Sequence, residues 1–172
     1  MTTAPASSDR WAFKEWAVVC RALALGKQDV ILRKGGIVEP GGKFRLETRD
    51  FLLLPTFVHQ SADNIVPAAR ELFENIEADE LPDGLVRFTH AVQVRNAFVV
   101  TDEAALAALR PRHIWSDAIV AERFNRWERR LDVFVVDVTP LPAPLYFPWH
   151  DSHGGCKSWV RVEDEPVEWV PQ

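Results

Sequence analysis

Phe51-Leu-Leu-Leu-Pro-Thr-Phe-Val58 is an almost unbroken apolar run in the first half of the chain. It is too short for a secure helix and contains Pro55, so it predicts a strand buried at the centre of a sheet. His59-Gln60 follow directly. Side chains at a strand end often project into a cleft, and a histidine there can act as a general base, whereas capping of a backbone group is the structural alternative.

Before this run, the spacing of apolar residues predicts one amphipathic helix from an N-cap at Asp9 to Gly26. Asp29–Arg33 and a segment beginning at Phe44 then indicate two strands joined by a glycine-rich connection.

After the run, Ser61 begins a predicted helix that continues to about Ala78. A long strand follows at 85–101, with an interruption near Asn96, and short helices begin after Asp102 and at Ser116. The remaining patterns predict a strand at 131–139, a stiff connector at Pro140, Pro142 and Pro144, and closing strands at 145–147 and 158–162.

This order lacks the regular alternation of strand and helix that builds a doubly wound parallel sheet. We therefore expect an α+β fold with a mixed or barrel-like sheet and flanking helices. The 172 residues suit one domain. The expected parts are a disordered lead at 1–9, a single α+β domain at 10–162 and an acidic C-terminal tail at 163–172.

The composition excludes collagen-like, low-complexity and wholly disordered proteins. Hydrophobic residues make up 47% and charged residues 26%, as in globular domains, and the net charge of −5 means that any binding of nucleic acid needs a local patch. Cys20 and Cys156 suit reduced thiols in the cytoplasm. No apolar stretch approaches the roughly 18 residues of a membrane span, so we expect no membrane partner. No catalytic or cofactor motif is specific. We expect no cofactor and leave open whether the protein is an enzyme.

Three stretches carry a family resemblance: Lys14–Val19 continuing through Leu32–Ile37, Phe51–Gln60 and Gly155–Val160. Together they resemble the bacterial family called domain of unknown function 1802, over nearly the whole chain from Ala12 to Val160. The family has no assigned activity. Some of its members are linked to restriction-endonuclease-type domains, so the resemblance implies work on DNA or RNA and a restriction-type protein partner.

The segment from Leu25 to Arg33, with the later Pro40-Gly41-Gly42 turn, is similar to the opening of the PUA-like group. The activating-signal-cointegrator homology branch of that group carries Gly, Lys, Glu and Arg at fixed spacing. Gly26 and Arg33 fit this spacing, but Gln28 and Ile31 replace the Lys and the Glu. The resemblance therefore implies a PUA-like fold rather than the hydrolase activity of that branch.

Arg33-Lys34-Gly35-Gly36, followed by Lys43, is the candidate phosphate site. Successive glycines let backbone N–H groups converge on an anion, and the basic side chains supply charge. A structural turn is the alternative. We expect Lys157 and Ser158 to join this patch and Trp159 or Trp115 to stack on bases.

Other groupings carry weaker signals. His150, Asp151, His153 and Cys156 share one loop, but a zinc site usually needs a second, distant pair of ligands, so we predict no metal. Cys156 beside Lys157 is a candidate thiolate, with a loop cysteine as the alternative. A helix from Ser116 places several arginines on one face that could follow a nucleic-acid backbone: Arg123, Arg126 and Arg130.

The sequence thus favours a nucleic-acid or phosphate-ligand binding module. One alternative is a metal-dependent phosphodiesterase or nuclease with a degenerate motif, in which Asp29, Glu39 or Asp50 would hold the metal. The other is a structural or partner-binding subunit with a tryptophan-rich surface.

Overall fold

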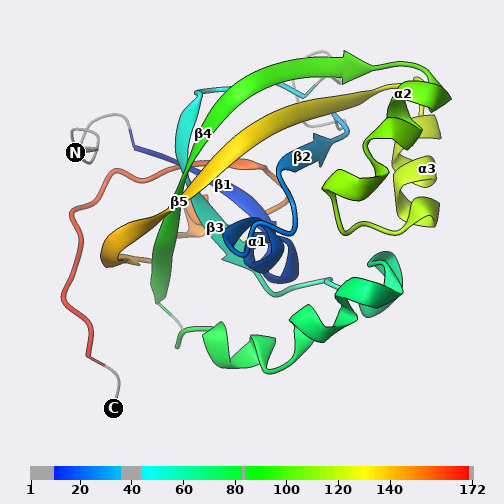
Figure 1. The fold of residues 1–172 in the computed structure, drawn as a ribbon. Helices are drawn as coiled ribbons and strands as arrows, with labels where there is room; N and C mark the ends of the chain where they lie inside the picture. The colour runs from blue at the N-terminus through cyan, green and yellow to red at the C-terminus, as the bar shows by residue number, and fades with distance from the viewer. Residues whose placement is uncertain (1–9, 36–43, 83, 171–172) are drawn as a thin grey trace.

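The structure is a computed structural model and describes residues 10–35, 44–82 and 84–170 (Figure 1). Six strands form one sheet in the order β2-β5-β4-β3-β1-β6. Strands β1 and β3 are parallel and the other neighbours are antiparallel, so the sheet is mixed, as predicted. The strands are β1 (Trp11–Trp16), β2 (Val30–Arg33), β3 (Asp50–Thr56), β4 (Leu85–Val100), β5 (Leu131–Pro148) and β6 (Trp159–Arg161).

Both faces of β3 are buried, which explains its continuous apolar run. Phe51 and Leu53 belong to the larger hydrophobic core, whereas Leu52 and Leu54 belong to a smaller core that also contains Phe88. Successive side chains of a strand point to opposite faces, so one apolar run supplies both cores. The prediction of a buried strand within the sheet is confirmed.

Three α-helices lie among the described residues: α1 (Ala17–Ala24), α2 (Glu103–Ala108) and α3 (Asp117–Asn125). Asp102 and Ser116 cap α2 and α3, since their side chains accept hydrogen bonds from first-turn amides. Figure 1 shows β4 and β5 as two long, curved strands that run side by side toward α2 and α3. No helix in the described part of the chain has the length and apolar character needed to cross a membrane.

The predicted helix from Asp9 to Gly26 is wrong in its first half. Trp11–Trp16 forms β1, and only the residues after it form α1. Strand β1 lies between β3 and β6 and is buried on both faces, so its pairing with these neighbours overrides the helical spacing of its apolar residues.

The strand expected from Phe44 is also wrong, because residues 44–49 form no strand and β3 begins at Asp50. Strand β2 is confirmed, but it pairs with β5. Phe44 instead inserts into the larger core, with its ring centroid 6.1 Å from that of Phe13. Interlocking aromatic rings hold this segment without a ladder of backbone hydrogen bonds.

The predicted helix from Ser61 to Ala78 is a series of short 3-10 helices: η2 (Ala62–Asn64), η3 (Pro67–Phe73) and η4 (Ile76–Asp79). Pro67 has no N–H to donate, and Asn75 adopts a left-handed conformation with φ of 54°, so neither position continues a helix. Most positions of the predicted apolar face are nevertheless buried, among them Ile65, Leu72 and Ile76, whereas Ala68 is exposed.

The stiff connector expected at Pro140, Pro142 and Pro144 is wrong as well, because these prolines lie within β5. Strand β2 pairs with β5 only between Asp132 and Val135. Between Val136 and Tyr146, β5 has no second strand beside it in the described part of the chain, so proline is tolerated there.

Candidate pocket at the divergence of two strands

A pocket of about 600 Å³ opens where β3 and β4 separate. The two strands pair only from Asp50 to Leu52 on the β3 side. Pro55 then lacks the N–H that further pairing would use. Strand β4 also shifts register against β5 between Phe88 and His90, where the extra residues, 141–144, belong to β5. Because that irregularity lies in the β4–β5 pairing, Pro55 is the backbone feature that favours the opening between β3 and β4. Its volume lies within the range of about 300–1,000 Å³ typical of small-molecule sites.

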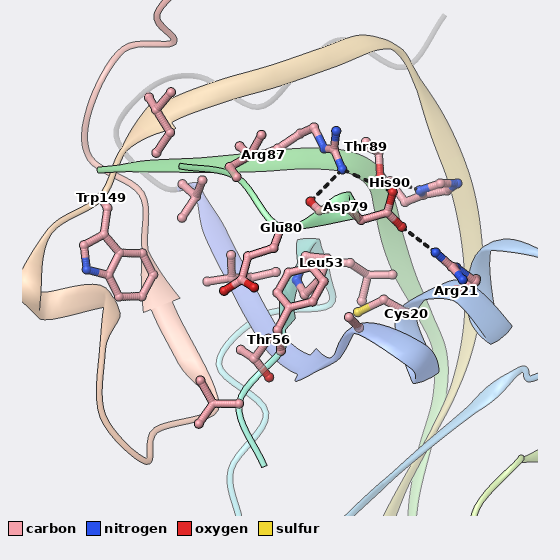
Figure 2. A pocket seen from close by; sticks show the side chains of 18 of the residues that line it. Cys20, Arg21, Leu53, Thr56, Asp79, Glu80, Arg87, Thr89, His90 and Trp149 are labelled. Carbon is pink, nitrogen blue, oxygen red and sulfur yellow. Dashed lines mark hydrogen bonds and ion pairs between the residues drawn. The ribbon is translucent and has the colours of Figure 1, made fainter. Parts of the chain in front are cut away.

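The walls of this pocket come from β4 and from four other parts of the chain, and Figure 2 shows how they surround it. Helix α1 contributes Cys20 and Arg21, and the end of β3 contributes Thr56. The segment after η4 contributes Glu80, and Trp149 follows β5. Most of the lining is apolar, with a few polar groups, which is the usual composition of a ligand site.

One end of the pocket carries a fixed group of charges. Asp79 accepts a 2.7 Å hydrogen bond from Arg21 and forms a longer ion pair with Arg87, at 3.8 Å. Arg21 also donates to the carbonyl oxygens of Leu72 and Glu74 and so fastens the 3-10 segment to α1. Arg21 is therefore a structural residue, whereas Arg87 has donors left over for a ligand.

His90 lines the same end of the pocket. Burial lowers the pKa of His90, so its imidazole is neutral at physiological pH. Its Nδ1 lies 2.9 Å from the hydroxyl oxygen of Thr89. A neutral imidazole in this position offers a hydrogen bond to a ligand without adding charge.

The other end of the pocket carries Trp149, whose side chain is 39% exposed. Its ring contacts that of His153, with centroids 5.4 Å apart. Gly154 lies against the same indole, because a Cβ added to that glycine would be 3.7 Å from it. The small residue thus allows the loop to pack closely beside Trp149. An accessible indole supported in this way can stack on a planar ligand.

Two lysines lie beside this end of the pocket, and we call Lys14 and Lys157 the lysine pair. Lys14 is buried and donates a 3.0 Å hydrogen bond to the carbonyl oxygen of Gly155. Burial lowers the pKa of Lys14, and the charge of Lys157 lowers it further. Burial and His150 lower the pKa of His153, and the lysine pair adds to this effect, which places all these groups close together. Neither lysine has a carboxylate partner among the described residues.

Two basic members of the predicted phosphate patch have partners inside the protein. Arg33 turns into the larger core, where its Nη2 lies 3.4 Å from Glu15 and its guanidinium packs over Phe13 at 4.6 Å. Lys34 donates to carbonyl oxygens that follow α3, among them that of Arg130 at 2.9 Å. These contacts give both side chains structural roles.

The other predicted site residues also have internal contacts. Gln60 accepts a hydrogen bond from the Val18 amide at the start of α1, and the neighbouring His59 is exposed with φ of 64°. The Ser158 carbonyl accepts from the Lys14 amide, so Ser158 joins β1 to the loop. Gly35 is buried, whereas Gly36 and Lys43 lie outside the described residues.

The two tryptophans expected to stack on bases are held by the core. Trp159 packs against several aromatic rings and donates its indole N–H to the carbonyl oxygen of Arg45. Trp115 is fully buried beneath the guanidinium of Arg123, at 4.1 Å. Burial lowers the pKa of Arg123 to about 10. These contacts occupy the ring faces that a base would need.

The predicted basic helix face is wrong, because α3 ends at Asn125 and both Arg126 and Arg130 lie beyond it. Arg126 pairs with Glu122, and Arg130 forms a largely buried pair with Asp132. Among the described residues, no group of three or more His, Cys, Asp or Glu side chains is arranged to hold a metal ion. Asp29 accepts two hydrogen bonds from Arg112 instead.

The mixed sheet, its parallel β1–β3 pair and the flanking helices define a PUA-like α+β domain. Two solved structures share this fold, a tyrosine-to-phenylalanine and a serine-to-alanine variant of ASCH from Zymomonas mobilis. Their TM-scores are 0.53 and 0.50 at 10% and 9% identity, and the matches cover 90% and 91% of this chain and 90% and 89% of theirs.

A family model described as "Domain of unknown function (DUF1802)" matches residues 12–171, and the chain belongs to this family. No curated protein matches the chain. Both resemblances expected from the sequence are thus confirmed: the family and the PUA-like fold.

Sequence reasoning missed the pocket itself. Glu80 belongs to an acidic run before a turn, and Trp149 is one of seven tryptophans, so neither stands out in the sequence. The available signal was Pro55 within an apolar strand. A proline there limits pairing on one side and indicates where a sheet can open.

Proposed function

We propose that the protein binds single-stranded nucleic acid, with one unstacked base in the pocket against Trp149 and the adjacent phosphate on the lysine pair. The observation that carries this proposal is the position of two lysines without carboxylate partners in the described structure, next to an open apolar pocket with an accessible indole.

The pocket supports the base-binding half of the proposal. A base inside a duplex is stacked on both faces, whereas a single strand can turn one base out onto an aromatic side chain. Trp149 is accessible and lies at the pocket. Such stacking contributes about 1–3 kcal/mol per base and tolerates different sequences.

The lysine pair supports the phosphate-binding half. Burial lowers the pKa of Lys14 and the nearby charge of Lys157 lowers it further, so an anion between the two lysines relieves their repulsion. The site also explains how a chain with a net charge of −5 binds a polyanion, because contact is confined to one local patch.

The test is fluorescence anisotropy with labelled single-stranded RNA, single-stranded DNA and duplexes of the same sequence. We expect single strands to bind and duplexes to bind more weakly. One neutralised phosphate predicts a loss of about 2.6-fold in affinity between 50 and 200 mM salt, from a slope of about −0.7 per phosphate. Trp149→Ala should lower affinity by about 5- to 150-fold, the equivalent of one lost stacking contact.

Two matched controls accompany these variants. Trp127→Ala removes another exposed indole, 64% accessible, that does not line the pocket. Lys27→Ala removes a lysine that pairs with Glu71, whereas Lys157→Ala should weaken binding and lower the salt slope. Equal losses for Trp149→Ala and Trp127→Ala would contradict the assigned site, and absence of binding at low salt would refute the function.

The finer parts of this function remain predictions. A restriction-type protein partner rests on the family resemblance alone. A cytoplasmic location agrees with the free thiols of Cys20 and Cys156.

A further inference from the structure

Glu80 is distinct among the polar groups that line the pocket. Asp79 is occupied by Arg21 and Arg87, and the hydroxyl of Thr56 donates to a backbone carbonyl. Among the described lining residues, Glu80 has the one carboxylate without a hydrogen-bond or ion-pair partner. An ionised carboxylate only accepts hydrogen bonds, so this group selects a ligand that presents donors.

The position of Glu80 indicates which part of the ligand it meets. Figure 2 shows its carboxylate directed toward the side of the pocket where Trp149 lies. Trp149 offers a ring face, whereas Glu80 offers two acceptor oxygens. A base stacked on the indole therefore turns one edge toward the carboxylate.

Nucleobases differ in the donors on that edge. Guanine places N1–H and the 2-amino group side by side, so one carboxylate can accept two parallel hydrogen bonds from it. Adenine and cytosine offer one amino group, and uracil one imino N–H. Because a charged, bidentate arrangement is stronger than a single hydrogen bond, a carboxylate favours guanine over the other bases.

We infer that the pocket selects guanine, with Glu80 as the specificity-determining residue. This inference rests on the proposed function and concerns the same site. The negative charge of Glu80 also disfavours a phosphate within the pocket, which agrees with phosphate binding outside it at the lysine pair.

The experiment compares guanosine, inosine, adenosine, cytidine and uridine monophosphates by isothermal titration calorimetry with the full chain. Guanosine monophosphate should bind about tenfold more tightly than the others, including the inosine compound, which lacks the 2-amino group. Glu80→Gln should remove most of this preference and leave the affinity for the other nucleotides nearly unchanged. Glu77→Gln is the matched control, because Glu77 lies in the same acidic run but not at the pocket.

The outcomes separate this inference from the function on which it rests. If all five nucleotides bind equally and Trp149→Ala abolishes binding, the guanine preference is refuted and the proposed function stands. If guanosine monophosphate is preferred but Glu80→Gln keeps the preference, the role of Glu80 is refuted. If neither nucleotides nor single strands bind, both proposals fail. Thermal unfolding of each variant verifies that it is folded.

Discussion

Replacing Arg33 with alanine should destabilise the protein strongly. Glu15 is 2% exposed, and Arg33 is the one ion-pair partner it has in the described structure, at 3.4 Å. Arg33 also donates a 2.5 Å hydrogen bond to the Lys14 carbonyl oxygen and packs over Phe13. The substitution leaves a buried carboxylate without its counter-charge.

The magnitude follows from that uncompensated charge. Breaking a buried ion pair by removing one partner costs about 3–5 kcal/mol. For a chain of this size, 1 kcal/mol corresponds to about 2–4 °C, so Arg33→Ala should lower the melting temperature by about 6–20 °C. Replacing both Glu15 and Arg33 with methionine removes the buried charge altogether and should recover most of the loss.

The assay is urea unfolding followed by tryptophan fluorescence, with Arg95→Ala as the control. Arg95 pairs with Asp137 on the surface and is 68% exposed, so its removal should cost about 0.2–1 kcal/mol. A loss below about 1 kcal/mol for Arg33→Ala would show that the Glu15–Arg33 pair is not buried as described. The result also bears on nucleic-acid binding, because a variant that unfolds loses binding for reasons unrelated to phosphate contact.

Three further predictions concern single residues. Burial lowers the pKa of His113 to about 4, below its usual value near 6.5. The free energy of unfolding should therefore be unaffected by His113 above pH 6.5 and fall by about 3 kcal/mol as the pH drops to 4, and His113→Phe should remove this fall in urea unfolding. Cys156 is exposed and Cys20 is buried with a raised pKa, so a thiol reagent should modify one cysteine in the native protein and two after unfolding; two fast reactions would contradict the burial of Cys20. Asp102→Ala removes the cap of α2 and should cost about 1 kcal/mol in thermal unfolding, whereas Asp102→Asn should cost much less.

The sequence predicts elements well where local signals and tertiary pairing agree. The apolar run of β3 and the caps at Asp102 and Ser116 are such cases, because each depends on residues that are neighbours in the chain. The prediction for Trp11–Trp16 is wrong, because the spacing of its apolar residues fits a helix and only pairing with β3 and β6 makes it a strand. The residues after Ser61 show a third case, in which the buried face is predicted correctly and the helix type is not.

The site was less accessible to sequence reasoning because its parts are far apart in the chain. Lys157 was singled out from its local sequence, but its partner Lys14 lies more than one hundred residues away and reaches it through the pairing of β1 with β6. Arg33 looked like a phosphate ligand because its charge is visible in the sequence. Its carboxylate partner becomes evident only when β1 and β2 are placed in the fold.

The pocket at the divergence of β3 and β4 depends on a backbone feature, the missing N–H of Pro55, rather than on the side chains that line it. The existence of the cavity and its selectivity are therefore encoded separately. A substitution at Glu80 or Trp149 would therefore change the proposed ligand without redesign of the fold. A substitution of Pro55 that restored pairing along β3 would instead close the cavity itself.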